Sequence, residues 1–397
     1  MVPDGRRGVS KRVAIFGASG LVGTAVVERL LKQGRDDIVP LIHSSGNAWR
    51  LASQGIPLKQ VDLLDKATLQ GALNGCTHVV NCSRGEDDFM IQGLRNLLEV
   101  ARAEKVERFV HLSSVAVYGD PPHPLSITED APTEPAKGSY GWVKLHQDTM
   151  VAKAAKEGLN AITLCPPNIG GPSSYFLIQL TTLLRAGGFA LLEDGATCCN
   201  VVDVANLAAA VESALERGPN DGKRVFVTDQ MDVTWRDVIG GLAPLAGVQW
   251  AEIPRITRKE LAQVWPPAKE HLSVTRAVKH VLSSDVRRAL RKDPLLRKVD
   301  QTLRDTIARF GSVAEGRVRK SLYGSLRPSQ VSVEPELNYQ ICAQQLRGIR
   351  HSSARATQTI GYKPPYSFQE SMAAFAAWYR WHHGFDSPFS DLTRELF

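Results

Sequence analysis

Residues 12–33 read RVAIFGASGLVGTAVVERLLKQ, and this stretch decides the fold. Arg12–Gly17 is a short apolar run that ends in glycine, which predicts a buried strand. Thr24–Gln33 carries apolar residues at helical spacing, which predicts a helix that follows at once. A strand, a glycine-rich turn and a helix in this order indicate the first unit of an α/β sheet.

The glycines of the turn are three residues apart. Gly17 permits a tight turn, Gly20 lets a pyrophosphate approach the backbone, and Gly23 lets the helix pack closely on the strand. The free N–H groups at the helix N-terminus then favour phosphate binding. This context favours dinucleotide binding over the alternative, a merely structural turn. The turn residues predicted to contact the dinucleotide are Gly17, Ser19, Gly20, Leu21, Val22 and Gly23.

Strand-like and helix-like segments go on alternating through the first half of the chain. Further strands are predicted at Ile38–Ile42, Leu58–Val61, His78–Cys82, Arg108–Ser113, Leu159–Cys165 and Val225–Thr228. Helices are predicted at Met90–Glu104 and Tyr140–Glu157, and an aromatic-rich helix at Phe368–His383 is expected to pack on the core. Short buried strands separated by helices predict an α/β fold, a doubly wound parallel sheet of the Rossmann type.

The predicted domain division follows the change of pattern near Gly170. Residues 11–170, with parts of 195–230, are expected to form the dinucleotide-binding domain. Residues 171–397 are expected to form a smaller C-terminal substrate lobe, which includes a basic helical insertion at about 255–350.

Composition is ordinary for a globular protein, with 43% hydrophobic and 22% charged residues among 397. The six cysteines lack metal-ligand spacing, so no metal site is expected and a reducing cytoplasm fits. We expect neither a secretion signal nor a membrane span, because the first ten residues are polar and no run reaches eighteen apolar residues.

The positive charge belongs to one segment. Residues 255–350 contain 20 Lys/Arg and 9 Asp/Glu, an excess of 11, although the whole chain has a net charge of only +7. Within this segment, Ser284–Phe310 reads as an amphipathic helix with a cationic face. A solvated face is the plainer interpretation, and peripheral contact with an anionic membrane surface or recruitment of an anionic substrate or partner stays open. Nucleic-acid binding has no motif to support it.

Tyr140 and Lys144 stand four residues apart at the start of a predicted helix, so their side chains share one face. A nearby ammonium is expected to lower the pKa of the tyrosine, which could then move the proton that accompanies hydride transfer. Ser114 closes the preceding strand, where its hydroxyl could orient a substrate oxygen. These three residues are the predicted catalytic set.

The end of the second strand bears on the choice between NAD and NADP. Residues 41–45 read LIHSS, and no carboxylate stands there to repel a 2′-phosphate. His43, Ser44 and Arg50 further on therefore favour NADP slightly over NAD. Asp62 and Leu63 follow the third strand, where the carboxylate could meet the adenine or serve as a helix N-cap.

The chain resembles the extended short-chain dehydrogenase/reductases, the NAD(P)-dependent epimerase/dehydratase group. The resemblance covers about residues 11–240 and resumes near Thr359–Arg380. The matching segments are GASGLVG (17–23), SSVAVYG (113–119), YGWVK (140–144), PPNIGGP (166–172), NVVDVA (200–205) and GYKPPYSFQESM (361–372), together with the Asp62-Leu63 pair. It implies Ser114, Tyr140 and Lys144 as catalytic residues. Tyr140 and Lys144 would also touch the cofactor, with Cys82, Ser83 and Pro167, and Asn168 would touch the substrate.

Departures from the family pattern make some of the family's reactions less expected for this chain. Val115 and Ala116 stand where dehydratases and decarboxylases of the family usually carry an acid, so those reactions are less expected. A nucleotide-sugar epimerase or dehydrogenase is favoured. Cys165 stands where many sugar-nucleotide members have arginine, and Met90 where an asparagine is common. A reductase or dehydrogenase of a hydrophobic, steroid-like alcohol or ketone is therefore the nearest alternative, and a cofactor-sensing protein without turnover is another.

Two further side chains are candidates for substrate contact. Arg84 follows the fourth strand and could meet a phosphate or carboxylate, or form a surface ion pair with Glu86–Asp88. Tyr118 could line the pocket. His78 and His111 are interpreted as structural histidines. The family implies a homodimer through the helix that bears Tyr140, and the basic insertion leaves this open.

Overall fold

The computed structural model describes residues 11–264 and 337–382. Of the described residues, 11–261 and 337–382 form one compact unit. Residues 337–350, which the sequence analysis assigns to the basic insertion, thus belong to the same unit as the predicted dinucleotide-binding domain. The predicted amphipathic helix at Ser284–Phe310 lies outside the described residues.

The centre of this unit is a seven-stranded sheet in which every pairing is parallel, in the order β10-β6-β5-β4-β1-β2-β3. The predicted doubly wound fold is confirmed. Its strands are β1 (Val13–Phe16), β2 (Ile38–Ile42), β3 (Lys59–Gln60), β4 (His78–Asn81), β5 (Arg108–Leu112), β6 (Ala161–Cys165) and β10 (Asp221–Phe226).

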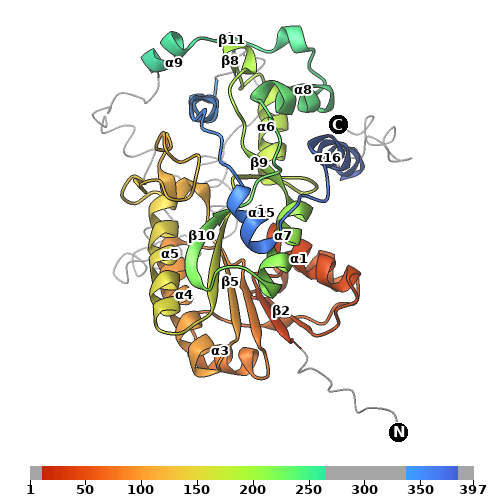
Figure 1. Cartoon of the computed structure of the whole chain (residues 1–397). Coiled ribbons are helices and arrows are strands. Elements are labelled where there is room, and N and C mark those ends of the chain that lie inside the picture. Colours follow the sequence, from red (N-terminus) through yellow and green to blue (C-terminus); the bar gives the residue numbers. More distant parts are fainter. Residues whose placement is uncertain (1–10, 265–336, 383–397) are drawn as a thin grey trace, which may run out of the picture. The chain divides into compact units, whose positions relative to one another are not determined.

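Helices cover both faces of the sheet, as Figure 1 shows. One face packs against α1 (Leu21–Lys32), α7 (Val204–Glu216) and α15 (Ala354–Ile360). The other face packs against α3 (Lys66–Leu73), α4 (Asp87–Ala103) and α5 (Tyr140–Lys156). Each face therefore has its own apolar core, and the strands between them are buried on both sides.

The remaining elements lie at the carboxyl end of the sheet or join its strands. α6 packs on α8, and α16 packs on α8 and β7 (Figure 1). The predicted C-terminal helix is thus present as α16. The bounds of this group are α2 (Trp49–Ala52), β7 (Asn168–Gly170), α6 (Tyr175–Arg185), β8 (Leu191–Leu192), β9 (Val201–Asp203), α8 (Trp235–Ala246), β11 (Arg255–Ile256), α9 (Arg258–Val264), α14 (Tyr339–Ala343) and α16 (Phe368–His382). Five short 3₁₀ turns complete the described elements: η1 (Ser45–Asn47), η2 (Val115–Tyr118), η3 (Glu193–Gly195), η4 (Trp250–Glu252) and η5 (Gln344–Leu346).

Three local predictions need correction. β10 begins at Asp221 rather than Val225, and β3 is only two residues long. The N-cap of α3 is Asp65, whose carboxylate accepts a hydrogen bond from the Ala67 N–H at 2.9 Å. Asp62 instead closes a tight turn by accepting from the Leu64 N–H at 2.9 Å, so it is not the cap.

Candidate active site

The carboxyl ends of β1, β5 and β6 and the loop after β4 meet at a cavity of about 470 Å³. This is the edge where open parallel sheets bind their ligands. Six of the residues singled out in the sequence line it: Leu21, Arg84, Ser114, Tyr140, Pro167 and Asn168. Segments as distant in sequence as the glycine turn and the helix that bears Tyr140 therefore converge on one site.

The glycine turn has the geometry that a dinucleotide requires. Gly17 has φ +74°, and a Cβ there would lie 2.8 Å from the Cys82 carbonyl oxygen. At Gly23 a Cβ would lie 2.1 Å from the Gly17 carbonyl oxygen, so the helix can reach the strand only without a side chain. Gly20 is the N-cap of α1 and provides no side-chain cap, so the N–H groups of the first turn stay available to a phosphate. The turn thus fits a pyrophosphate.

Lys144 is fixed beneath the cavity rather than exposed in it. Ser139 caps α5 by accepting from the Trp142 N–H at 3.2 Å, and the helix presents Tyr140 and Lys144 on one face. The Lys144 Nζ donates to the Leu112 carbonyl oxygen at 2.8 Å, and the side chain is buried. Burial lowers the pKa of Lys144 to about 8.

The pKa of Tyr140 responds to burial and to a second cation, Arg84. Burial raises the pKa of its phenol, and the guanidinium of Arg84 opposes this rise. Arg84 lies over the ring at 5.1 Å from its centroid, whereas the Lys144 Nζ lies 6.0 Å away. Arg84 is therefore a cation beside Tyr140 that favours its phenolate, and the expected effect of Lys144 on the pKa of Tyr140 stays a prediction.

Ser113 and Ser114 both line the cavity, and their hydroxyls have different surroundings. Ser114 lines the cavity, and its Oγ accepts from the Ala116 N–H at 3.2 Å as the cap of η2. Its hydroxyl proton remains available to a substrate oxygen. Ser113 is 4% exposed and its hydroxyl faces the sheet side of α5.

The residues near the predicted adenosine end of the cofactor site differ in their exposure and in their contacts. His43 and Ser44 are exposed at the end of β2. Arg50 is taken up by Glu28, to which its Nε donates at 2.8 Å, so it is less available to a 2′-phosphate than the sequence suggested. Leu63 is buried against α4, and Asp62 is half-buried beside it. Cys82 and Ser83 lie against Gly17.

Of the three residues predicted to contact the substrate, two line the cavity and one does not. Asn168 and Arg84 line the cavity. Tyr118 does not, because its ring is fully buried and its hydroxyl donates to the Glu129 carbonyl oxygen at 2.8 Å. The expectation that Tyr118 lines the pocket is therefore corrected.

Several lining residues carry no sequence signal. The cavity is completed by Tyr175, Phe176, Trp235, Cys198, Asn200, Gln344, Arg347 and His351. Tyr175 is 72% exposed, so an aromatic face is open to a ligand. The Arg347 guanidinium forms a two-point ion pair with Asp120, at 2.9 and 2.7 Å. Part of the wall therefore comes from residues that the sequence assigned to the basic insertion.

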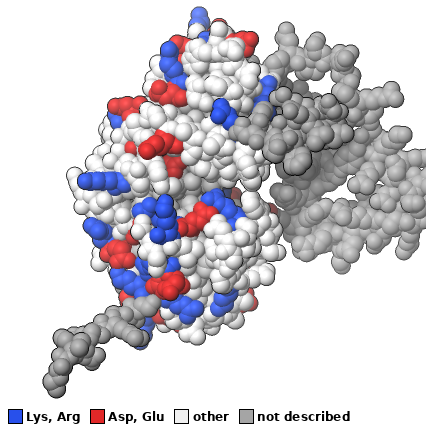
Figure 2. Space-filling view, turned by 90° about the vertical axis from the view of Figure 1, so that its right-hand side faces the viewer, with Lys and Arg blue, Asp and Glu red and all other residues white. Residues whose placement is uncertain are grey.

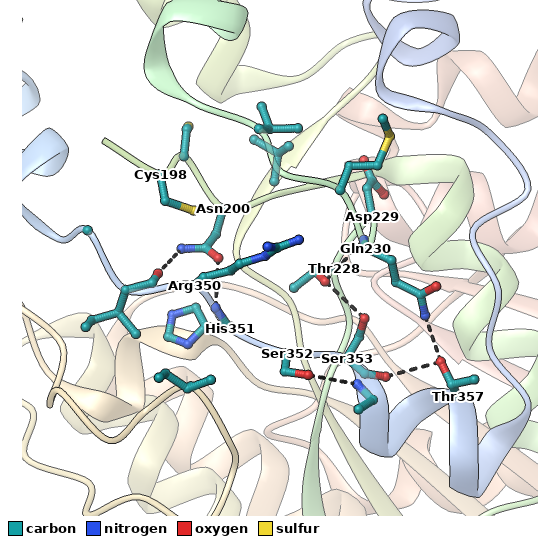
Figure 3. A pocket seen from close by; sticks show the side chains of 18 of the residues that line it. Cys198, Asn200, Thr228, Asp229, Gln230, Arg350, His351, Ser352, Ser353 and Thr357 are labelled. Atoms are coloured by element: carbon teal, nitrogen blue, oxygen red, sulfur yellow. Dashed lines mark hydrogen bonds between the residues drawn. The ribbon is translucent and has the colours of Figure 1, made fainter. Parts of the chain in front are cut away.

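A second cavity of about 830 Å³ shares Cys198, Cys199, Asn200 and His351 with the first. Figure 3 shows how Asn200 joins the two segments of this shared wall. Its amide donates to the Ile349 carbonyl oxygen at 2.6 Å, and its Oδ1 accepts from the His351 N–H at 3.0 Å. One side chain thus fixes the wall between the two cavities.

Two other features, a metal site and a membrane-spanning helix, are absent from the described residues. No group of three or more His, Cys, Asp or Glu side chains within residues 11–264 and 337–382 could hold a metal ion. No helix of the described part is long and apolar enough to cross a membrane. Figure 2 shows acidic and basic side chains interspersed on the described part of the face in view.

The sequence of the chain places it in a known family. Residues 13–227 match the model of the NAD dependent epimerase/dehydratase family, which is more than half of the chain. The chain belongs to this family. It is accordingly an enzyme of the NAD-dependent epimerases, dehydratases and reductases.

Relatives within the family act on different substrates. A 4-hydroxy-2-methyl-3-oxo-4-farnesyl-3,4-dihydroquinoline-1-oxide ketoreductase of Stigmatella aurantiaca is 27% identical over 62% of this chain and 76% of the relative. A UDP-glucose 4-epimerase of Streptomyces lividans is 30% identical over 41% of this chain and 54% of the relative. The crystal structure of UDP-glucuronic acid 4-epimerase from Bacillus cereus in complex with NAD has a TM-score of 0.60. It is 15% identical, over 94% of this chain and 99% of that one, and this likeness supports the fold.

Proposed function

We propose that this family member catalyses hydride transfer at a carbinol or ketone carbon, with Tyr140 as the acid or base. The observation that carries the proposal is convergence on one cavity. Tyr140, Ser114 and Arg84 line the same space that the glycine turn opens into, and Lys144 lies directly beneath. When bound, the nicotinamide cofactor would supply or accept the hydride.

The chain's own residues would handle the proton and the oxygen. The Ser114 hydroxyl would donate to the substrate oxygen while its Oγ stays anchored by the Ala116 N–H. Tyr140 would exchange a proton with that oxygen, and the guanidinium of Arg84 would favour its phenolate. Lys144, held by the Leu112 carbonyl, would keep a positive charge near the reacting groups.

A nucleotide-sugar-type substrate is the favoured class. The cavity offers the exposed ring of Tyr175 for a base to stack on, and two arginines, Arg84 and Arg347, for phosphates. The UDP-glucose 4-epimerases among the relatives support the same class. In an epimerase the hydride returns to the same carbon, so no net oxidation of the cofactor is expected.

One observation favours the second candidate, reduction of a hydrophobic ketone. Asp120 already neutralises Arg347, which leaves Arg84 as the other arginine of the described lining to meet a phosphate. The remaining wall is rich in aromatic and thiol groups, and the ketoreductase relative spans much of this chain. Such a reaction would consume NAD(P)H.

The experiment distinguishes the epimerase from the ketone reductase by whether the nicotinamide cofactor is consumed. The purified enzyme is incubated with UDP-glucose or UDP-galactose and, separately, with a panel of 3-ketosteroids and NADPH or NADH. Interconversion of the sugars without net change in absorbance at 340 nm supports the epimerase. Loss of absorbance with a ketone, absent in Tyr140→Phe, supports the reductase. Tight nucleotide binding without turnover in either panel would point to a cofactor-sensing protein.

NADP(H) is proposed as the preferred cofactor, on weaker support than the residues after the second strand suggested by themselves. The exposed His43 and Ser44 stand at the end of β2, where no carboxylate would repel a 2′-phosphate. The pairing of Arg50 with Glu28 weakens this preference. Separate titrations with NADPH and NADH decide it, and tighter NADH binding would reverse it.

A further inference from the structure

The two faces of the sheet differ in chemistry beneath the active site. On β5 and β6, Val110, Leu112, Ile162 and Leu164 point to the face covered by α1 and α7 and belong to its apolar core. The alternate residues point toward α5, and at the far end of the strands they are the apolar Phe109 and Ala161, which belong to the core of that face. Nearer the active site the same side of the sheet carries polar side chains: His111 on β5, Ser113 just after β5, Thr163 on β6 and Arg224 on β10.

These polar residues form a continuous row. The register pairs His111 with Thr163, and Thr163 with Arg224, across three neighbouring strands. The first two side chains are fully buried, and that of Arg224 is 24% exposed. A parallel sheet that is covered on both faces usually presents apolar side chains here.

Asp148 enters this row from α5. It stands four residues after Lys144, so the two side chains lie on the same helix face, and both are buried. The Asp148 carboxylate lies 3.6 Å from the Arg224 Nη1 and 4.0 Å from the His111 Nε2. The helix thus places an acid directly behind the proposed catalytic lysine.

The hydrogen bonds of this region are incomplete. Among the described residues, neither Asp148 oxygen has a hydrogen-bond partner of normal geometry, and the same holds for the His111 Nε2, the Ser113 Oγ and the Thr163 Oγ1. A buried polar atom without a partner is destabilising, so a cluster of them needs an explanation. The Ser113 hydroxyl is nonetheless close enough to lower the pKa of Asp148.

The charge states in the row follow from their contacts. Asn81 donates to the His111 Nδ1 at 3.2 Å, and the Asn81 Oδ1 accepts from Ser83 at 2.6 Å, which fixes the amide orientation. His111 is therefore a neutral ring with its proton on Nε2, consistent with burial that lowers its pKa well below the usual value. This neutral histidine leaves the charge of Asp148 to be balanced by Arg224 and Lys144.

We propose that Asp148, which lies in the buried polar row behind the active site, is a positioning residue that keeps Lys144 charged. The two opposite charges lie in an interior that screens them weakly. The charged groups that face Asp148 are Lys144 from its own helix and Arg224 from β10. Titratable neighbours are His111 from β5 and Cys165 from β6. This inference rests on the proposed role of Lys144 in the reaction.

The pKa directions agree with this geometry. Burial lowers the pKa of Lys144 to about 8, and Asp148 is the largest opposing influence. Burial raises the pKa of Asp148 to about 6, against the effects of Ser113, Arg224 and Lys144. The acid therefore favours the charged form of the amine, and the amine favours the charged form of the acid.

The test measures the amine itself. Full-length protein labelled with ¹³Cε-lysine is titrated by NMR, and the Lys144 signal is assigned by its loss in Lys144→Arg. We expect Asp148→Asn to lower the midpoint from about 8 toward neutral. Each unit of this shift is a tenfold smaller ratio of charged to neutral amine at a given pH. Asp148→Glu should restore the midpoint, and Glu157→Gln, an exposed acid just beyond the same helix, should leave it unchanged.

An unchanged Lys144 midpoint in Asp148→Asn would overturn the proposal and leave Asp148 as a partner of Arg224 only. Titration of ¹³Cγ-aspartate in the wild type provides a second measurement that needs no variant to fold. Because Lys144 and Arg224 lower the pKa of Asp148 whereas burial raises it, an Asp148 midpoint well above about 6 would also count against the coupling. Because both readouts need no substrate, they stand apart from the proposed function, which fails separately if the wild type binds neither NADPH nor NADH.

Discussion

Replacing Gly20 with alanine separates the folding role of the glycine turn from its binding role. Gly20 has φ −80°, which any residue adopts, and an added Cβ would meet only the Gly17 carbonyl oxygen, at 3.3 Å. The same change at Gly23 would bring a Cβ to 2.1 Å from that oxygen. Gly20→Ala should therefore alter the free energy of unfolding by less than about 1 kcal/mol, and Gly23→Ala should lower it by about 1–3 kcal/mol or more.

The binding effect of Gly20→Ala should be much larger than its folding effect. A methyl group at the N-cap of α1 would stand where a pyrophosphate approaches the first-turn N–H groups. Losing one hydrogen bond to a charged group costs about 1.5–3 kcal/mol. At about 1.4 kcal/mol per tenfold, the Kd for NADPH should rise about 10- to 150-fold.

Nicotinamide fluorescence titration gives the Kd, and urea unfolding gives the stability. Gly71→Ala is the matched control, because Gly71 lies in α3 with open space around its Cα and far from the turn in sequence. A folded Gly20→Ala protein that binds NADPH and NADH as tightly as the wild type would refute the reasoning. The glycine turn would then be structural only.

Three other perturbations test the electrostatics of the molecule. Tyr140→Phe should bind NADPH within a few-fold of the wild type yet lose about 10²–10⁴-fold in turnover, which steady-state kinetics on the identified substrate would measure. Arg84→Met removes the cation over the Tyr140 ring, so the phenol should ionise at higher pH, measured by absorbance at 295 nm with Tyr140→Phe subtracted; an unmoved midpoint would reject that contact as the cause. Burial raises the pKa of Asp229 to about 6, so the wild type should lose stability as the pH rises from about 4 through 6, by up to roughly 3 kcal/mol. In urea unfolding, Asp229→Asn should lack this slope, and parallel curves for the two proteins would contradict the assignment.

The sheet and the chemistry at its edge could be predicted because their signals are local. The apolar run before Gly17, the glycine spacing and the Tyr140–Lys144 interval each lie within a few residues of sequence. β10 was placed too late for an equally local reason. Its first four residues, Asp221–Arg224, include charged side chains that an edge strand tolerates but that propensity does not favour.

The rest of the cavity wall could not be predicted, because its contacts join segments far apart in the chain. Asn200 meets Ile349, and Arg347 meets Asp120, across 149 and 227 residues. Nothing in the residues near Arg347 indicates such a partner, and the local excess of positive charge suggested a solvated insertion instead. The stacking of Arg84 on Tyr140 depends likewise on how the loop after β4 approaches the start of α5.

One signal beneath the site was present in the sequence and was not interpreted. RFVHLS places His111 and Ser113 at alternate positions, and AITLC places Thr163 between apolar residues, in strands that are buried on both faces. In a half-exposed sheet that alternation marks the solvent face, but α5 covers this one. The polar residues are therefore buried against the helix that carries Tyr140, Lys144 and Asp148. His111 is a structural histidine, as expected, and its neutral ring in this row leaves Lys144 and Arg224 to balance the acid.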